Sequence, residues 1–458
     1  MIFNSPKKDW PNRHSRRNAG AKLLVLLYAI AFFLLVGFSS LYAANPLIQP
    51  IALPSISQDA RTYLDPDTAD QPLMSDVVQN QRAAHSLLLF WMPWSTHDRL
   101  GIRDQLSLIS HYRANGYYGY NFHRLSSNLV AQWQDEIRGA TAVGGRAAII
   151  VQHTPLRALP TALPVYGDFH AAGEGYPFDL LQISAEWVGK PISVLYLSRA
   201  GDWAFIDDGD AMGWLSTRDM AYVTVSDQLK LKQSPIVAVI KDFVPIKNNS
   251  GEFLFDSRIG MLLASINQMV LVPVRRSDGY AEFRRVSLPK DLAVNYPWAA
   301  TPRHFTLLMN QMMGQPYGWG GLYNYRDCSL TMKNLFAPFG IDLPRNSQAQ
   351  ANFGHKWSLI GLSDTEKENF IATHAKPYMS LLHMHGHIVL YLGQYHGDGI
   401  IFQNKWGLAT DDPQGDQGRA VLGQAHIAPL SFGRNVPYAA TTFIKSVDSL
   451  TNLITPAQ

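Results

Sequence analysis

The chain of 458 residues contains one cysteine, Cys328, and this feature constrains its fold more than any other. A single cysteine forbids an internal disulfide and any metal site built from several cysteines. Stability must therefore come from buried apolar surface, and the 47% of hydrophobic residues supply enough material for packed cores. Because domains of about 150 residues are typical, a chain of this length is expected to form about three of them.

The charge of the chain is almost balanced, with 39 basic and 36 acidic residues and a formal net charge of +3. Six of the basic residues lie in the first 22 positions, namely Lys7, Lys8, Arg13, Arg16, Arg17 and Lys22. The rest of the chain has no basic excess, so its charge gives no support to a nucleic-acid partner.

The N-terminal segment has the three parts of an export signal. Basic residues precede an apolar run at 23–38, and a stretch rich in small residues follows at 39–44. Two interpretations of residues 1–44 stay open: a cleaved signal peptide, or a retained membrane anchor, because the uncharged stretch at 23–57 is long enough to span a bilayer. Both interpretations place the rest of the chain outside the cytoplasmic membrane, in the periplasm or the cell envelope.

Changes of sequence texture divide the remaining chain into four expected domains, at 45–155, 156–228, 229–296 and 297–458. The first is mostly helical, with apolar residues three and four apart at 73–89 and 100–112. The next two are expected to be small all-β barrels, because short apolar runs alternate there with turns. Their strands are expected at 192–197, 203–206, 213–215, 236–240, 260–263, 269–274 and 280–286. The last domain mixes helices and strands, so the chain is expected to be an α+β multidomain protein.

Cys328 lies where a helix is expected to begin. A glycine-rich turn at 316–321 leads to Asp327, a good N-cap residue, and apolar residues at helical spacing follow at 330–336. The unpaired N–H groups of a first helical turn, together with a nearby imidazolium, can lower the pKa of a thiol and favour the thiolate that cysteine catalysis needs. The alternative for a lone cysteine is a buried structural thiol.

Three histidines at alternate positions, His383, His385 and His387, precede a strand-like run that ends at Leu392. Because alternate residues of a strand share one face, the pattern permits a metal site, a structural role, or a catalytic base at His387. The metal site is disfavoured, because Gly386 is expected to break the strand and the chain offers no His-Glu-x-x-His helix.

A second strand is expected at 400–403, after a turn at 397–399. In the hairpin that the two strands would form, Gln403 can face the same way as His387. Together with Cys328, these residues would supply a nucleophile, a base and a group that orients the base.

These motifs resemble the signatures of NlpC/P60 cysteine peptidases. The matching segments, in the order of the family, are Pro-Tyr-Gly-Trp-Gly-Gly at 316–321, Arg-Asp-Cys-Ser at 326–329, Leu-Pro-Arg-Asn-Ser at 343–347 with Gln350, and Gly-His-Ile-Val-Leu-Tyr-Leu-Gly at 386–393. The third segment also matches a branch of the family that carries bacterial SH3-like (SH3b) domains.

Weaker similarity to that branch extends toward the N-terminus. Trp-Met-Pro-Trp at 91–94 resembles part of its N-terminal stabilising domain, and the segments at 178–182 and 202–205 resemble its first SH3b domain. The resemblance implies a papain-like catalytic domain, in which a helix bearing the cysteine packs on an antiparallel sheet. Two SH3b domains and a stabilising domain would precede it.

The resemblance also implies the reaction: hydrolysis of peptidoglycan stem peptides or muropeptide fragments between γ-D-glutamate and a diamino acid, without a metal or an organic cofactor. By position, Cys328 would be the nucleophile, His387 the base and Gln403 the orienting residue, where the family uses histidine, asparagine or glutamine. Two other functions stay open: a non-catalytic cell-wall-binding protein, and an amidase or acyltransferase with the same cysteine chemistry.

Three further residues match substrate positions of the family. Tyr317 would line the cleft near the reacting carbonyl, and Asp327 and Ser329 would contact the amino end of the substrate. The alternative for these three residues is a role in the turn and the helix cap. The first SH3b domain would wall one side of the cleft, but no motif identifies its contact residues.

Overall fold

The structure is a computed structural model that describes residues 48–95, 103–114, 116–411 and 416–454. The segment expected to be a signal peptide or membrane anchor, residues 1–44, lies outside these ranges. Within the described ranges, no helix is both long enough and apolar enough to cross a membrane.

The N-terminal part is mostly helical, as its apolar spacing predicts. Its elements are β1 (Ile48–Pro50), η1 (Ala60–Tyr63), α2 (Asp76–Trp91), η2 (Met92–Trp94), α3 (Arg103–Ala114) and α4 (Ser127–Arg138). The start of α2 is set by Ser75, whose side chain accepts a hydrogen bond from the Val78 N–H. Apolar side chains of α3 and α4, among them Ile109 and Trp133, pack in one cluster with Trp214 of the first β domain.

The first β domain is a seven-stranded sheet in the order β4-β3-β7-β6-β5-β2-β8. Its strands are β2 (Thr141–Ile150), β3 (Thr154–Arg157), β4 (Gln182–Glu186), β5 (Pro191–Leu197), β6 (Trp203–Asp207), β7 (Met212–Ser216) and β8 (Met220–Tyr222). The strands expected at 192–197, 203–206 and 213–215 all occur in this sheet. Because β2 joins it, the sheet includes residues that precede the domain start expected at residue 156.

The second β domain follows the short helix α5 (Val225–Gln233) and contains a five-stranded sheet in the order β14-β13-β12-β9-β15. Its strands are β9 (Ile236–Val239), β12 (Leu262–Ile266), β13 (Met269–Arg275), β14 (Ala281–Val286) and β15 (Ala293–Asn295), and β10 (Pro245–Lys247) with β11 (Phe253–Asp256) forms a separate hairpin. All four strands that the sequence predicts here overlap strands of the five-stranded sheet.

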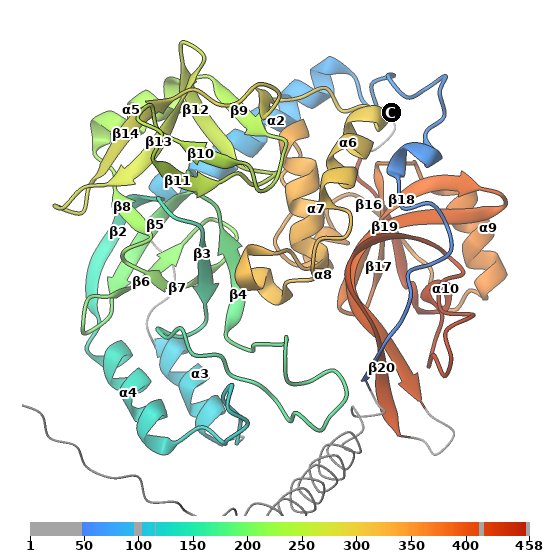
Figure 1. The fold of residues 1–458 in the computed structure, drawn as a ribbon, viewed down its shortest axis with the longest axis horizontal. Coiled ribbons are helices and arrows are strands. Elements are labelled where there is room, and N and C mark those ends of the chain that lie inside the picture. The colour runs from blue at the N-terminus through green and yellow to red at the C-terminus, as the bar shows by residue number, and fades with distance from the viewer. Residues whose placement is uncertain (1–47, 96–102, 115, 412–415, 455–458) are drawn as a thin grey trace, which may run out of the picture. The chain divides into compact units, whose positions relative to one another are not determined.

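The C-terminal part contains a seven-stranded sheet in the order β1-β20-β19-β18-β17-β21-β16, drawn mostly in red in Figure 1. Its remaining strands are β16 (His355–Ser358), β17 (Ser380–Met384), β18 (His387–Tyr395), β19 (Asp398–Asp411), β20 (Gln417–Pro429) and β21 (Ser449–Asn452). The helical elements are α6 (Pro302–Met312), η3 (Trp319–Asn324), α7 (Cys328–Phe336), η4 (Ala337–Phe339), α8 (Ser347–Gln350), α9 (Asp364–His374) and α10 (Phe443–Ser446).

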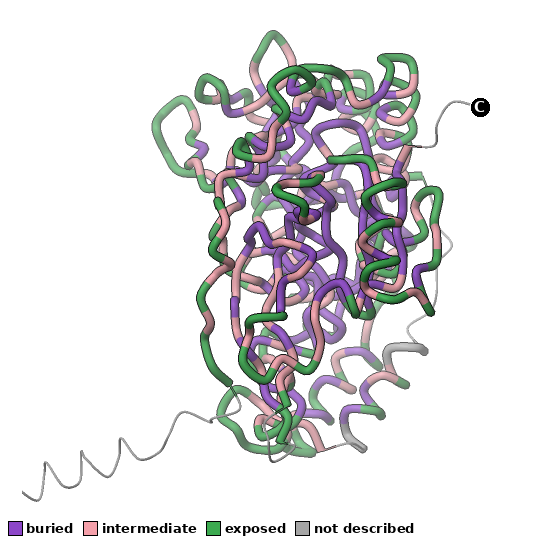
Figure 2. The backbone as a smooth tube through the Cα atoms, turned by 90° about the vertical axis from the view of Figure 1, so that its right-hand side faces the viewer, coloured by how far each residue is buried: buried purple, intermediate pink, exposed green. Residues whose placement is uncertain are grey.

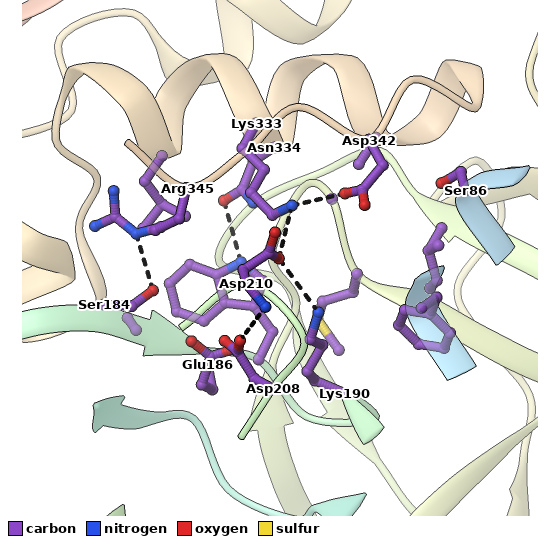
Figure 3. Close-up of a pocket in the computed structure, with 18 of the residues that line it drawn as sticks. Ser86, Ser184, Glu186, Lys190, Asp208, Asp210, Lys333, Asn334, Asp342 and Arg345 are labelled. Carbon is purple, nitrogen blue, oxygen red and sulfur yellow. Dashed lines mark hydrogen bonds and ion pairs between the residues drawn. The ribbon is translucent and has the colours of Figure 1, made fainter. Parts of the chain in front are cut away.

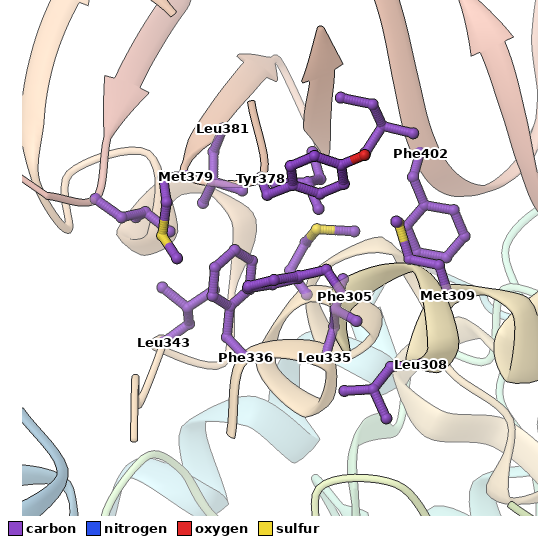
Figure 4. Packing of buried hydrophobic residues seen from close by; sticks show 14 of the residues in the cluster. Phe305, Leu308, Met309, Leu335, Phe336, Leu343, Tyr378, Met379, Leu381 and Phe402 are labelled. Carbon is purple, nitrogen blue, oxygen red and sulfur yellow. The ribbon is translucent and has the colours of Figure 1, made fainter. Parts of the chain in front are cut away.

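The main core of this part lies between α6, α7 and one face of the sheet. Phe305 of α6 and Phe336 of α7 meet edge to face with ring centroids 5.0 Å apart. Leu381 of β17 and Phe402 of β19 close the layer from the sheet, and all four side chains are buried (Figure 4). Because this packing holds α7 against the sheet, the N-terminus of the helix has a defined place beside the strands.

A buried ion pair joins the second β domain to the segment just before α7. The Arg326 guanidinium donates to both carboxylate oxygens of Asp242, each at 2.8 Å, and both side chains are 2% exposed. Removing one partner of such a pair typically costs about 3–5 kcal/mol, because an uncompensated buried charge is left. Figure 2 shows that the buried backbone segments gather in the interior, with the exposed ones in the surrounding loops.

Candidate active site

The turn that leads to Cys328 is shaped by two glycines in η3. Gly320 and Gly321 have φ angles of 57° and 89°, in the left-handed region that other residues rarely adopt. A Cβ on Gly320 would lie 2.5 Å from the carbonyl oxygen of Gln182, and one on Gly321 would lie 2.5 Å from the Ala185 side chain. Both neighbours belong to β4, so the first β domain lies directly against this turn.

The helix α7 begins at Cys328 because Asp327 caps it. The Asp327 carboxylate accepts a hydrogen bond from the Leu330 N–H at 2.8 Å, which is the cap that the sequence predicts. The same carboxylate pairs with Arg345 at 2.8 Å, and Arg345 also donates to the Ser184 hydroxyl of β4 at 2.9 Å. The start of the helix is therefore tied to the first β domain by side chains as well as by the glycine turn.

A polar cavity of about 80 Å³ lies behind α7, where the helix faces the first β domain (Figure 3). Lys333 of α7 reaches into it and pairs with Asp342 at 2.6 Å and with Asp210 at 3.0 Å. Asp210 lies on the turn between β6 and β7. These ion pairs join α7 to the first β domain.

The Cys328 thiol lies against the backbone on both sides of His387. Its Sγ is 4.0 Å from the carbonyl oxygen of Gly386, and the N–H of Ile388 interacts with the sulfur as well. The residues Cys328 and His387 are each 6% exposed. Only a small part of either group therefore reaches the surface.

The imidazole of His387 is held from the neighbouring strand. Its Nε2 lies 2.8 Å from Oε1 of Gln403, whose side chain is fully buried. The two residues belong to β18 and β19, which pair antiparallel around the expected turn. The neighbourhood predicted from the hairpin therefore occurs, and Nδ1 is the ring nitrogen that Gln403 does not bond.

Burial sets the protonation of this pair. It raises the pKa of the Cys328 thiol to about 12, with a further contribution from the nearby Asp327 carboxylate. Burial, followed by the Lys405 ammonium, lowers the pKa of His387. The N-terminus of a helix stabilises a thiolate by about 0.3–1 kcal/mol, which lowers the thiol pKa by less than about one unit, since one unit corresponds to about 1.36 kcal/mol. The position of Cys328 at the start of α7 therefore does not offset the effect of burial. Both shifts favour a thiol and a neutral imidazole, whereas the helix position alone predicts a lowered thiol pKa.

The residues expected to contact substrate lie around the thiol. The half-buried Tyr317 has its pKa raised by burial and by Cys328 and Asp327, so its hydroxyl lies within electrostatic reach of both. The Ser329 hydroxyl donates to Asp327 at 3.1 Å and accepts from Arg345 at 2.9 Å. Asp327 and Ser329 thus serve the helix cap here, and their contact with a substrate stays a prediction.

A loop of the first β domain reaches the same region. The ring of Phe178, which lies between β3 and β4, contacts Trp319 and Trp406 edge to face, with centroids 5.1 Å and 6.0 Å apart. Gly173 of this loop lies so close to Arg419 of β20 that a Cβ would come within 2.5 Å of its guanidinium. Phe178 and Gly173 are thus residues through which the first β domain contacts this region, and no sequence motif identifies them.

The two other histidines of the alternating pattern lie apart from this arrangement. Nδ1 of His383 bonds both carboxylate oxygens of Asp448, at 2.8 Å and 3.0 Å. His385 is exposed in the turn at Gly386, which has a φ of 74°. In the described part of the chain, no group of three or more His, Cys, Asp or Glu residues could hold a metal ion.

Two titratable residues of the site were not singled out from the sequence. Nε2 of His426 lies 3.0 Å from the amide nitrogen of Gln403. Lys405 follows Gln403 by two positions on β19, and burial lowers its pKa to about 8. The alternation of His426 with the apolar residues Ala425 and Ile427 predicts a strand here. The spacing does not show that this strand pairs with β19 and so brings His426 to Gln403.

Because its pKa is raised, Cys328 is expected to react with iodoacetamide at a rate that keeps rising to about pH 10. Below the pKa, the thiolate fraction grows about tenfold per pH unit. Free cysteine, with a pKa of about 8.5, should level off earlier and is the control. Mass spectrometry follows the reaction without background, because the chain has one cysteine. A rate that is flat between about pH 6 and pH 8 would instead show a thiolate–imidazolium pair at rest.

Three family models match the chain. An SH3 domain (SH3b1 type) matches residues 164–216, an SH3 domain of SH3b2 type matches 226–268, and the NlpC/P60 family matches 314–415. The last range contains Cys328, His387 and Gln403, and none of the three includes residues 45–155. A search of curated proteins found no significant match.

Among solved structures, an NlpC/P60 endopeptidase from Photobacterium damselae subsp. piscicida is similar over most of the chain. It is 26% identical, the alignment covers 89% of this chain and 99% of that chain, and the TM-score is 0.81. An NlpC/P60 family protein from Bacillus cereus is 16% identical over 68% of this chain and 100% of that chain, with a TM-score of 0.45, and we draw no conclusion from it. The chain is thus a multidomain α+β protein that carries an NlpC/P60 domain after two SH3b-type domains.

Proposed function

We propose that this protein is a cysteine peptidase that hydrolyses peptidoglycan stem peptides between γ-D-glutamate and the diamino acid that follows. One observation carries the proposal: the Cys328 thiol lies against the backbone that flanks His387, and Gln403 bonds the imidazole. The NlpC/P60 match across these residues and the likeness to a solved NlpC/P60 endopeptidase support it.

The reaction starts from the neutral thiol and imidazole. As the Cys328 sulfur attacks the carbonyl carbon of the amide, Nδ1 of His387 takes the thiol proton, while Gln403 holds Nε2. The carbonyl oxygen becomes an oxyanion. The N–H of Cys328, at the first position of α7, has no partner within the helix and can donate to it.

The second half of the reaction returns both groups to their starting state. His387 gives its proton to the leaving nitrogen, so the free amine departs and a thioester remains on Cys328. His387 then takes a proton from a water molecule as its oxygen attacks the thioester. The carboxylate product leaves, and the proton returns to the sulfur.

Two observations support the proposed substrate: the family resemblance, and the limited access to Cys328. The low exposure of Cys328 and the nearby Phe178 loop favour short stem peptides over intact, cross-linked cell wall. For the amino end of the substrate we propose Asp327, whose Oδ2 accepts from Arg345 alone among the described residues. Tyr317 would line the cleft near the carbonyl group that Cys328 attacks.

Cys328→Ala is expected to abolish hydrolysis of tri- and tetrapeptide muropeptides while leaving the fold intact, because the chain has no other thiol. His387→Ala should be equally inactive, and His385→Ala, in the exposed turn, is the matched control that should keep full activity. Product masses report the reaction and separate hydrolysis from transfer to another acceptor. Unchanged turnover by Cys328→Ala would end the cysteine-peptidase proposal, and wall binding without any cleavage by the natural protein would favour a wall-binding function.

The cleaved bond is expected to be the one after γ-D-glutamate. Digestion of a defined stem peptide should then release a fragment that begins with the diamino acid and carries a new free amine. Tandem mass spectrometry locates that amine. Products cut at the amide between the glycan and L-alanine, with the γ-D-glutamyl bond intact, would show that the proposed bond is wrong.

Gln403→Ala is expected to lower kcat roughly 3- to 100-fold, because one hydrogen bond to His387 is lost and a buried partner is left unpaired. KM should change little, since Gln403 contacts the base and not the substrate. Gln403→His should keep more activity, because a neutral imidazole can accept from one neighbour and donate to the other. Gln394→Ala, at an exposed glutamine of β18, is the control. A fully active Gln403→Ala variant would show that Gln403 does not orient the base.

A further inference from the structure

A second histidine lies behind the proposed catalytic residues. His426 of β20 is directly opposite Gln403 in the strand pairing and is fully buried. Its Nε2 is 3.0 Å from Nε2 of Gln403, and its Nδ1 is 2.9 Å from the carbonyl oxygen of Gln424. With His387, these groups form one line of hydrogen bonds that ends at a main-chain carbonyl.

The carbonyl at the end of this line decides which atoms donate. A carbonyl oxygen can only accept, so Nδ1 of His426 carries a proton. A neutral imidazole has one ring proton, which means that Nε2 of His426 must accept. Burial lowers the pKa of His426 to about 4 and so keeps the ring neutral at neutral pH. The Gln403 side chain must therefore point its NH2 group toward His426 and its oxygen toward His387.

The direction of this amide in turn sets the tautomer of His387. Because the Gln403 oxygen accepts, Nε2 of His387 carries the ring proton, and Nδ1 keeps a lone pair for the proton of Cys328. A reversed amide would present NH2 to Nε2, and the ring proton would have to move to Nδ1, where it blocks the base. In a serine peptidase, an amide that enforces the wrong histidine tautomer lowers kcat about 10,000-fold.

We propose that His426 is a positioning residue: it holds the Gln403 amide in the one direction that leaves His387 able to accept the Cys328 proton. The inference rests on the proposed function, in which His387 is the base. This role for His426 is needed because the orienting residue is a glutamine. A carboxylate accepts through either oxygen, whereas an amide needs a partner that selects its direction.

The other charged and titratable groups around this line do not bond the amide. Lys405 of β19 acts electrostatically on both His387 and His426, and His383 of β17 acts on His387. Among the described residues, the two hydrogen bonds of the Gln403 side chain go to His387 and His426. The selection of the amide direction therefore falls to His426.

A double-mutant comparison separates this role from simple packing. In the natural background, His426→Leu leaves the amide free to reverse, so kcat should fall about 3- to 30-fold while KM stays within about twofold. In a Gln403→Glu background both side-chain oxygens accept, so His387 keeps its Nε2 proton whether or not a protonated His426 pairs with the carboxylate. Adding His426→Leu should therefore lower kcat by less than about twofold. His426→Gln, which keeps an amide oxygen near the Gln403 NH2, should lose less activity than His426→Leu.

Leu422→Ala is the control for lost packing, because Leu422 is buried on the same strand. Its effect should be the same in both backgrounds. The inference is overturned if His426→Leu is fully active, if its loss is confined to KM, or if the loss is equal in the two backgrounds. Should His426→Leu fail to fold, His426→Phe, whose side chain also lacks an acceptor for the Gln403 NH2, carries the same comparison.

The tautomer can also be read without any substrate. Nitrogen-15 NMR of the full chain, with the His387 signals assigned against His387→Ala, should show the ring proton on Nε2 in the natural protein and a mixture of tautomers in His426→Leu. A natural His387 with its proton on Nδ1 would overturn the inference even where stem peptides are cleaved. An Nε2–H tautomer that depends on His426 would support it even if no stem peptide is cleaved.

Discussion

The position of Cys328, the proposed nucleophile, depends on the carboxylate of Asp327. One of its oxygens accepts from the Leu330 N–H and caps α7, so that the helix begins at Cys328, and the other accepts from Arg345 at 2.8 Å. Arg345 also donates to Ser184 of the first β domain. Since a buried charge that loses its partner costs about 3–5 kcal/mol, the cap, the ion pair and the domain contact sustain one another. The sulfur is held in place by a neighbouring domain as much as by its own helix.

The group that positions the sulfur also keeps it protonated. The negative charge of Asp327 adds to burial in raising the pKa of Cys328, and burial lowers that of His387. Both shifts disfavour a thiolate at rest, so in the proposed reaction the base must take the proton as the new bond forms. The proposed reaction therefore depends on the imidazole of His387, on the hydrogen bond that it donates to Gln403 of β19, and on the bond from Gln403 to His426 of β20.

Local rules were enough to predict part of this site, and they stop where distant segments meet. The cap at Asp327 follows from residue type and position, and the neighbourhood of His387 and Gln403 follows from a hairpin with a short turn. His426 depends on the pairing of β19 with β20, and Arg345 on contacts with the first β domain, and neither is encoded in spacing. For the same reason the membership of β2 in the first sheet was not foreseen. Helix position, which is visible in a sequence, indicates that the pKa of Cys328 can be lowered, whereas the burial that raises it is not visible there.

The two glycines before Cys328 have a consequence for how such domains can be combined. Since no side chain fits between Gly320, Gly321 and β4, the surface of the first β domain constrains the turn that leads into α7. An SH3b-type domain with a different β4 would move that turn and, with it, Cys328. The first β domain is therefore not an exchangeable module attached to an independent NlpC/P60 domain. Substitutions at the contact surface of one domain would require matching substitutions in the other. A chimaera that joins this NlpC/P60 domain to an unrelated SH3b-type domain is expected to have the Cys328 sulfur out of position.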